Sequence, residues 1–150
     1  MLTTFVKRFT DHPIEYVKNH EQYFLKDTSL EHYFLPQDAI LIGLYLGKQQ
    51  EQQFIPSFNL LDIIAQYSKE KVFVNDLGEM DFLYGKHLRK RHVVDIQGVL
   101  EPGRYKLVQN KYDENIGYGI YLGERRDSVK ILHHILDRGI FIKRDKQLKK

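Results

Sequence analysis

Positively charged side chains are concentrated in one short segment, residues 86–92, which reads KHLRKRH. Six of its seven residues carry a fixed or titratable positive charge: Lys86, His87, Arg89, Lys90, Arg91 and His92. Lysine and arginine bind phosphate oxygens and fix the register of a protein on a nucleic-acid backbone. A segment of this kind, held between two folded elements, is therefore a candidate site for gripping a phosphate chain.

Two further basic groups follow in the second half of the chain. They are the pair Arg125-Arg126 and the final segment, residues 143–150, whose cations include Lys143, Arg144 and Lys146. Residues 1–70 hold 6 lysines and arginines against 9 aspartates and glutamates, whereas residues 71–150 hold 17 against 11. This asymmetry favours a polyanionic partner for the second half, because clustered cations release counterions when they meet phosphates. The alternative is a basic face that is only solvated.

The residues that would support catalysis are missing or poorly spaced. The sequence has no cysteine, which excludes disulfides, thiolate metal sites and a cysteine nucleophile. None of its four serines lies in a GxSxG-like motif, and residues 117–119 (GYG) lack the rest of a phosphate-binding or dinucleotide loop. We interpret these two glycines as a strand that another strand approaches closely. The sequence therefore argues against an enzyme, and no cofactor is expected.

The histidines do not have the spacing of a metal site. His87 and His92 are five residues apart and His133 and His134 are adjacent, so neither pair has the i, i+4 spacing of a helical zinc site. In an alternating strand, His133 and His134 point to opposite faces. No metal ligand is therefore assigned.

The first half of the chain reads as a mixture of short helices and strands. Asp11 and Pro13 predict a short helix over residues 10–22, and residues 23–26, 32–36 and 39–47 read as strands. Residues 48–53 (KQQEQQ) read as a polar connector. The clearest helix covers residues 57–71, with Ser57 as its N-cap and a stripe of apolar residues at helical spacing.

From Lys71 onward the pattern changes to short strands. Five segments read as strands: residues 71–75, 93–100, 104–110, 116–122 and 128–136. Residues 78–85 form one short helix, which Gly85 ends. Short strands at this spacing with one small helix predict a compact β-barrel. The sequence thus predicts an α/β lobe over 1–70 and a small barrel over 71–150, rigidly apposed.

Nothing in the sequence indicates a membrane segment. The longest apolar run, at residues 39–47, is far shorter than the roughly 20 residues that span a bilayer. The first residues lack the apolar core and cleavage site of a signal peptide. The expected compartment is therefore the cytosol.

Several of these segments also resemble a known family. Residues 82–90 (FLYGKHLRK) resemble the FLYG-x-H-x-x-K segment of the Nip-seven-like ribosome biogenesis factors. The resemblance continues through four further segments in the same order: residues 42–67, 71–75, 116–122 and 132–144. It covers most of the chain from about residue 40.

The resemblance implies an α+β protein with an N-terminal α/β pre-PUA domain and a C-terminal PUA domain, a β pseudo-barrel. In PUA domains RNA lies against the short helix, the loop after it and the last strand. Carried onto this chain, these elements hold the expected RNA-binding residues Lys86, Arg89, Lys90, Arg91, Lys143, Arg144 and Lys146. Tyr84 and Phe141 are read as core residues, with stacking on unpaired bases as the alternative.

One departure from the family pattern affects the expected mode of binding. Many PUA domains have a glycine in the loop after the helix, where this chain has Arg91 and His92. The bulkier loop favours phosphate gripping over close, base-specific recognition.

The expected function is that of a non-enzymatic RNA-binding protein in large-subunit biogenesis and pre-rRNA processing. Single-stranded or looped pre-rRNA is the expected RNA partner, and the acidic N-terminal lobe is expected to dock assembly proteins. The protein is expected in the cytoplasm, or in the nucleolus of a eukaryotic cell, and the short chain and basic second half favour an archaeal-type member. Two alternatives stay open: an accessory subunit of an RNA-modification enzyme (pseudouridylation or transglycosylation), and a protein-interaction module that no longer binds RNA.

Overall fold

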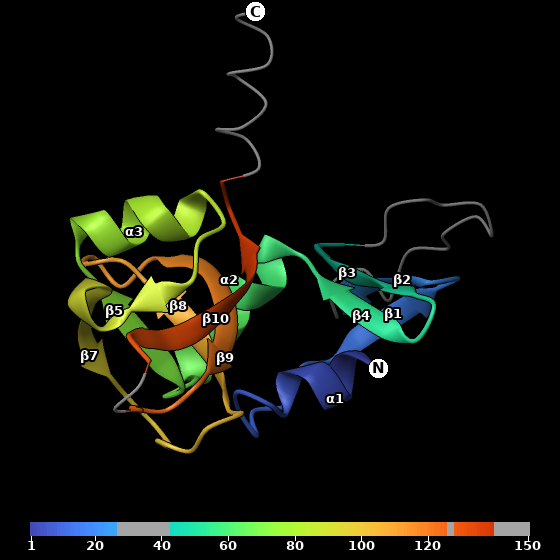
Figure 1. Ribbon diagram of the computed structural model, residues 1–150. Helices are drawn as coiled ribbons and strands as arrows, with labels where there is room; N and C mark the ends of the chain where they lie inside the picture. The colour runs from blue at the N-terminus through green and yellow to red at the C-terminus, as the bar shows by residue number, and fades with distance from the viewer. Residues whose placement is uncertain (27–42, 126–127, 140–150) are drawn as a thin grey trace, which may run out of the picture.

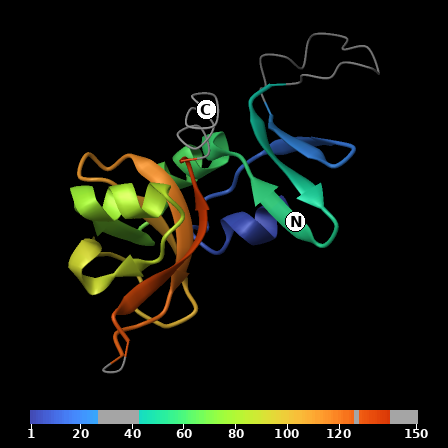
Figure 2. The ribbon, with the colours of Figure 1, turned by 45° about the horizontal axis from the view of Figure 1, so that its top comes forward.

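A computed structural model describes residues 1–26, 43–125 and 128–139 (Figure 1). Within these residues the chain forms two β-sheets, one of four strands and one of six, together with three α-helices. The larger sheet curves into a partly open barrel, and α3 packs against it (Figures 1 and 2). The mixed α+β class expected from the sequence is confirmed.

The smaller sheet comes from the first half of the chain. Its strands are β1 (Tyr16–Asn19), β2 (Gln22–Leu25), β3 (Tyr45–Gln50) and β4 (Gln53–Pro56). They pair antiparallel in the order β1-β2-β3-β4. Each strand therefore lies beside its neighbour in the sequence.

The predicted helix over residues 10–22 is wrong. Residues 16–25 instead form the β1–β2 hairpin, in which Val17 pairs with Phe24 and His20 takes a positive φ of 51° at the turn. The rings of Tyr16 and Tyr23 lie 5.2 Å apart across the hairpin. Cross-strand aromatic pairs of this kind stabilise a sheet, and this contact outweighs the local helix signal from Asp11 and Pro13.

The predicted polar connector at residues 48–53 is also wrong, because β3 and β4 extend into it and only Glu51 and Gln52 form the turn. Glu51 has a positive φ of 54°. The predicted strand at 39–47 contributes only its last three residues to β3, and residues 39–42 lie outside the described residues. The predicted strand at 32–36 also lies outside them, whereas residues 23–25 do form part of β2.

Two helices pack beside the smaller sheet. The predicted N-cap is confirmed: α2 (Phe58–Tyr67) begins after Ser57, whose hydroxyl accepts a hydrogen bond from the Leu60 amide at 3.2 Å. It ends four residues earlier than expected, because Ser68 is extended and Lys71 already begins a strand. The sequence analysis did not predict α1 (Leu2–Val6), whose three buried residues anchor it in the core.

The larger sheet has the strand order β6-β10-β9-β8-β5-β7, in which β5 and β8 are parallel and the other neighbours are antiparallel. Its strands are β5 (Lys71–Val74), β6 (Leu88–Arg89), β7 (Val93–Ile96), β8 (Tyr105–Gln109), β9 (Asn115–Tyr121) and β10 (Lys130–Asp137). The helix α3 (Asp76–Leu83) connects β5 to β6, and the short 3-10 helix η2 (Lys90–His92) precedes β7. All the strands predicted after Lys71 are present.

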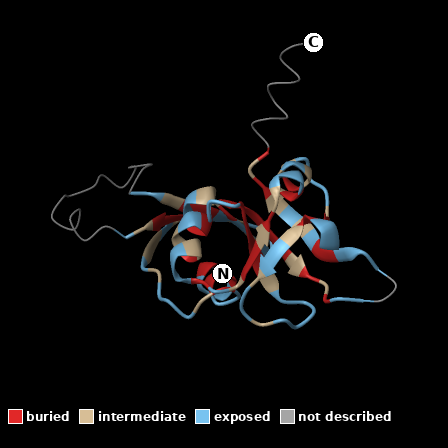
Figure 3. Cartoon of the chain, turned by 90° about the vertical axis from the view of Figure 1, so that its left-hand side faces the viewer, coloured by how far each residue is buried: buried red, intermediate tan, exposed pale blue. Residues whose placement is uncertain are grey.

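The apolar core is shared by the two sheets. One cluster joins Phe5 of α1 and Leu61 of α2 with Leu107 of β8 and Tyr118 of β9. A second cluster lies between the larger sheet and α3, around Phe82. Buried segments accordingly concentrate in the interior of the molecule, while loops and outer helix faces are exposed (Figure 3). The division into domains at residues 1–70 and 71–150 stays a prediction.

The two glycines of β9 allow β10 to approach closely, as the sequence predicted. Gly117 has a φ of 146°, and a Cβ at this position would collide with the carbonyl oxygen of Leu136. A Cβ at Gly119 would collide with the carbonyl oxygen of His133. These contacts position β10, whose first residues form part of the candidate site.

Candidate nucleic-acid interface

The side chain of Asn75 joins the basic segment at residues 86–92 to α3. The Asn75 side chain caps α3, because its Oδ1 accepts a hydrogen bond from the Gly78 amide at 2.8 Å. Its Nδ2 donates to the carbonyl oxygen of Arg91 at 2.8 Å. Gly85, with a φ of 82°, then turns the chain out of the helix. The helix and the basic segment are therefore fixed relative to each other.

All four cations predicted in this segment are exposed. The Lys86 ammonium is 2.9 Å from an Asp81 carboxylate oxygen, and this hydrogen bond is the main reason why the pKa of Asp81 is lowered. Lys90 lies 3.6 Å from Glu124, with both side chains largely exposed. Among the described residues no carboxylate forms an ion pair with Arg89 or Arg91.

The structure adds Lys130 to this group, a residue that the sequence analysis did not single out. Lys130 begins β10 and is the cross-strand partner of Arg89 in β6. The Lys90 amide donates to the carbonyl oxygen of Val129 at 3.0 Å, which holds η2 against the same end of β10. The pairing of β6 with β10 joins residues far apart in the sequence, so no local pattern could identify it. We call Lys86, Arg89, Lys90, Arg91 and Lys130 the basic face.

A buried histidine, His92, forms a hydrogen bond to the backbone of the basic face. His92 is only 1% exposed, and its Nδ1 accepts a hydrogen bond from the Arg89 amide at 3.1 Å. Its Nε2 lies 3.4 Å from Asp81 Oδ2 and 3.3 Å from Arg91 Nε, so both ring nitrogens face groups of the basic segment or of α3. Burial lowers the pKa of His92 although Asp81 opposes that shift, so the ring stays neutral at pH 7.

Three other histidines lie beside the basic face. The rings of His87 and His133 stack at 4.5 Å, and His87 Nδ1 accepts a hydrogen bond from the His134 amide at 3.0 Å. Burial, and then the neighbouring His133, lower the pKa of His87. His134 instead packs on Phe82 and lies 2.7 Å from Asp137, which confirms that His133 and His134 point to opposite faces. Across the described ranges no group of three ligand side chains is arranged for a metal ion.

Lys143, Arg144 and Lys146, as well as Arg126 and Phe141, lie outside the described residues. The described chain ends at Gly139, where a Cβ would collide with the carbonyl oxygen of Leu83 at the end of α3.

Tyr84 is 41% exposed, which corrects its reading as a core residue.

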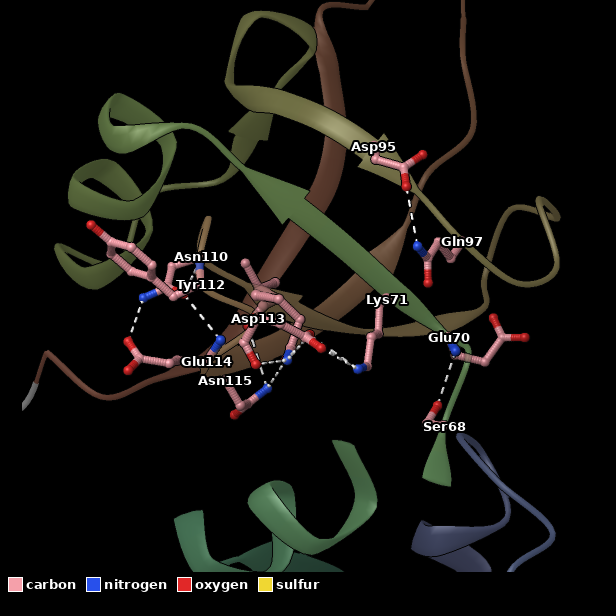
Figure 4. A network of polar contacts seen from close by, with 12 residues as sticks. Ser68, Glu70, Lys71, Asp95, Gln97, Asn110, Tyr112, Asp113, Glu114 and Asn115 are labelled. Carbon is pink, nitrogen blue, oxygen red and sulfur yellow. Dashed lines mark hydrogen bonds and ion pairs between the residues drawn. The ribbon is translucent and has the colours of Figure 1, made fainter. Parts of the chain in front are cut away.

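Several other cations of the second half are engaged in the fold. Lys106 is fully buried and donates to Glu70 Oε2 at 2.5 Å and to the carbonyl oxygen of Gln97 at 2.6 Å. Lys71 donates to Asp113 at 3.0 Å, within a network that fixes the β8–β9 loop (Figure 4). Burial raises the pKa of Asp113, but hydrogen bonds from Gln109 and Lys71 outweigh this and lower it. Neither lysine belongs to the basic face.

The part of the chain that the structure describes contains no helix long and apolar enough to cross a membrane.

Comparison with known proteins identifies the larger sheet. Residues 70–146, just over half of the chain, match the UPF0113 PUA domain. A conserved PUA-domain protein from Thermoplasma acidophilum shares the fold with a TM-score of 0.59 and 17% identity, over 96% of this chain and 91% of that one. A PUA domain from Aeropyrum pernix K1 has a TM-score of 0.50 and 15% identity, over 63% of this chain and 58% of that one.

Curated relatives are named as ribosome biogenesis proteins. The chain is 33% identical over 85 residues to the 60S ribosome subunit biogenesis protein nip7 of Schizosaccharomyces pombe, covering 56% of this chain and 47% of that protein. It is 28% identical over 116 residues to the NIP7 homolog of Danio rerio, covering 73% and 64%. The chain thus spans about half to two thirds of the length of these relatives. Together with the match of the PUA segment, these likenesses confirm the resemblance found in the sequence, and the chain belongs to the UPF0113 PUA-domain family.

Proposed function

We propose that this protein binds single-stranded or looped ribosomal RNA through its basic face and acts in the assembly of the large ribosomal subunit. The observation that carries the proposal is the convergence of exposed cations on β6, η2 and the start of β10. Arg89, Arg91 and Lys130 have no carboxylate partner within the described ranges, so an anion is the partner that their charges lack. The proposed assembly role draws on the names of the relatives.

The basic face suits a phosphate backbone better than a single small anion. Arg89 and Lys130 lie on paired strands, and Arg91 follows within one turn of η2, so the charges are spread over a surface. A chain of phosphates can contact several such cations at once and releases condensed counterions as it does so. Contacts of this type fix register but carry little sequence information. We infer that the loop containing Arg91 and His92 grips RNA without reading its bases.

The rest of the proposed role concerns the N-terminal lobe and the cellular setting. The acidic balance of residues 1–70 supports the docking of basic assembly proteins there. We propose a non-enzymatic protein, since the relatives are named as biogenesis factors. Its place is the cytoplasm, or the nucleolus in a eukaryotic cell.

Ultraviolet crosslinking in cells tests the proposal. We expect the wild-type chain to recover large-subunit ribosomal RNA well above background, and a variant with Arg89, Arg91 and Lys130 changed to Ala to recover much less. A matched variant with Lys7, Lys48 and Lys69 changed to Ala, all exposed and outside the basic face, should behave like wild type. Recovery of no ribosomal RNA would overturn the proposal. Co-purification of an RNA-modification enzyme would favour an accessory role in that reaction.

A further inference from the structure

An aromatic cleft lies between α1, β4 and the strands β8, β9 and β10. Its volume is about 540 Å³, within the range of small-ligand pockets. Its aromatic lining comes from four residues of both sheets and α1: Phe5, Phe54, Tyr105 and Tyr118. In Figures 1 and 2, α1 and β4 lie on the side of β10 away from α3, and no residue of α3 lines this cleft.

The polar groups of the cleft favour an electron-rich ligand. Arg8 is its charged lining side chain, Gln52 and Gln53 supply amide groups, and no carboxylate lines it. A second cavity, of about 600 Å³ between α2, α3 and the β8–β9 loop, is lined by four carboxylates, from Asp62, Glu79, Asp113 and Glu114, and its two lining cations, Lys71 and Arg138, are each paired with one of them. The two cavities thus differ in charge, and only the aromatic cleft suits a ligand attached to phosphates.

A tyrosine in this cleft has an unused hydrogen-bonding group. Tyr118 as a whole is only 6% exposed, but its hydroxyl is not among the buried polar atoms that lack a partner, so it is open to the solvent of the cleft, and no hydrogen bond joins it to a described residue. Burial raises the pKa of Tyr118 to about 12, so the hydroxyl keeps its proton and can donate to a carbonyl oxygen of a ligand.

The cation of the cleft is arranged for stacking. The Arg8 guanidinium lies over the Tyr105 ring at 4.4 Å from the ring centre, and Arg8 is exposed. The guanidinium thus makes a cation–π contact with Tyr105 and, as an exposed group that lines the cleft, can also contact a planar ligand there. Unpaired RNA bases stack on arginine planes and aromatic rings in this way.

We propose that the aromatic cleft receives one unpaired base of an RNA strand whose phosphates lie on the basic face. This inference rests on the proposed function and adds a base-binding site to it. The strand β10 connects the two regions, because it begins at Lys130 in the basic face and its Ile135 lines the cleft. Five residues of strand separate the two positions by about 16 Å, a length that a few nucleotides can span.

The test compares short oligouridines that each carry one abasic position with the fully based strand. Binding is measured for the wild-type chain and for Tyr118→Phe, which keeps the packed ring and removes only the hydroxyl. We expect wild-type binding to weaken more when the base is missing at one particular position than when it is missing at any other position. On the fully based RNA, Tyr118→Phe should weaken binding about two- to tenfold, the effect of one neutral hydrogen bond. When the base at that particular position is missing, Tyr118→Phe and wild type should bind the RNA equally, because the hydroxyl then has no base to contact.

Tyr112→Phe is the matched control, because Tyr112 is exposed in the β8–β9 loop and lies outside the cleft. It should leave binding unchanged on every RNA. If Tyr118→Phe weakens binding equally on all the RNAs, or has no effect on any of them, the base site is overturned. Binding that keeps its dependence on salt and on the basic face would then leave the proposed function intact, whereas no RNA binding by wild type would overturn both. A protein that co-purifies with wild type but not with Tyr118→Phe, while RNA binding is unchanged, would assign the cleft to a protein partner instead.

Discussion

The cations of the second half of the chain fall into two regions that use their charge differently. Near the β8–β9 loop and the ends of β5 and β8, four cations are paired with carboxylates, in the pairs Lys71–Asp113, Lys106–Glu70, Lys111–Asp76 and Arg138–Asp62. In the basic face, within the described residues, Arg89, Arg91 and Lys130 have no such partner. The net charge of a segment therefore does not locate its anion-binding surface. Pairing and burial decide which charges remain for a partner.

The physical difference lies in desolvation. A buried ammonium such as that of Lys106 is stable only with Glu70 and the Gln97 carbonyl oxygen beside it, so its charge serves the fold. An exposed arginine such as Arg89 keeps its hydration and contributes little to stability. The two regions should therefore respond in opposite ways to substitution, with stability lost in the first and RNA binding lost in the second.

The largest expected effect on stability comes from breaking the buried pair. Lys106→Met leaves the Glu70 carboxylate without its ammonium partner and should lower the free energy of unfolding by about 3–5 kcal/mol. Chemical denaturation of the variant measures this loss.

The double variant Lys106→Met with Glu70→Gln serves as the control for that prediction. Its glutamine can still accept from the Val99 amide, which donates to Glu70 at 3.1 Å, and it has no uncompensated charge. We expect it to be more stable than Lys106→Met alone. A single variant as stable as wild type would mean that the pair does not support the fold.

A smaller effect on stability is expected at Asn75, which caps α3 and also holds the backbone of the basic face. Asn75→Ala removes both the cap of α3 and the hydrogen bond to the Arg91 carbonyl oxygen, so unfolding should become easier by about 2 kcal/mol. RNA binding should also weaken, because the position of Arg91 is no longer fixed. Asn75→Asp keeps the cap but places an acceptor oxygen opposite the Arg91 carbonyl oxygen, so it should recover only part of the stability. If Asn75→Ala leaves both properties unchanged, the basic segment is positioned by other contacts.

The next largest effect is the dependence of stability on pH. The pKa of His92 is lowered by burial, so between that value and the ordinary value near 6.5 the unfolded chain binds a proton that the folded chain does not. Stability should therefore be fully present above about pH 7 and decrease as the pH falls through 6.5, by less than about 1.4 kcal/mol per pH unit for this one group.

His87, whose pKa is also lowered, adds to the same slope. Thermal melts of wild type and His92→Gln across pH 5–8 measure the contribution of His92. The variant should show a shallower dependence on pH, whatever its absolute stability. Parallel curves for the two proteins would show that His92 does not titrate differently on unfolding.

Local patterns in the sequence predicted the second half of the chain well and the first half poorly. The helix α2 follows from Ser57 and its apolar stripe, and α3 from its length and the Gly85 stop. The sequence predicts a helix where β1 lies, although it predicts most of β2 correctly as a strand, because β1 is determined by its pairing with β2 and not by its own local pattern. The short helix α1 has Thr3, Thr4 and Val6, which are poor helix formers, so its packing in the core determines it.

The candidate site was predictable only in part for the same reason. The basic segment is local and was found, but Lys130 joins it through a strand pairing that no local pattern contains. The partners of Lys71 and Lys106 are 42 and 36 residues away, so the sequence could not show which lysines are used by the fold. The aromatic cleft combines α1, β4 and three strands of the other sheet, so no local pattern in the sequence could bring its residues together.

The variant with Arg89, Arg91 and Lys130 changed to Ala should show the smallest effect on stability, within about 0.5 kcal/mol for each substitution. Its effect should be on binding. Fluorescence anisotropy with a labelled oligouridine across a salt series compares it with wild type and with the matched variant at Lys7, Lys48 and Lys69. We predict that the basic-face variant loses about 2 units of the slope of log affinity against log salt, since each lost phosphate contact removes about 0.7, while the matched variant keeps the wild-type slope. Equal slopes for all three proteins would contradict the claim that the basic face binds RNA.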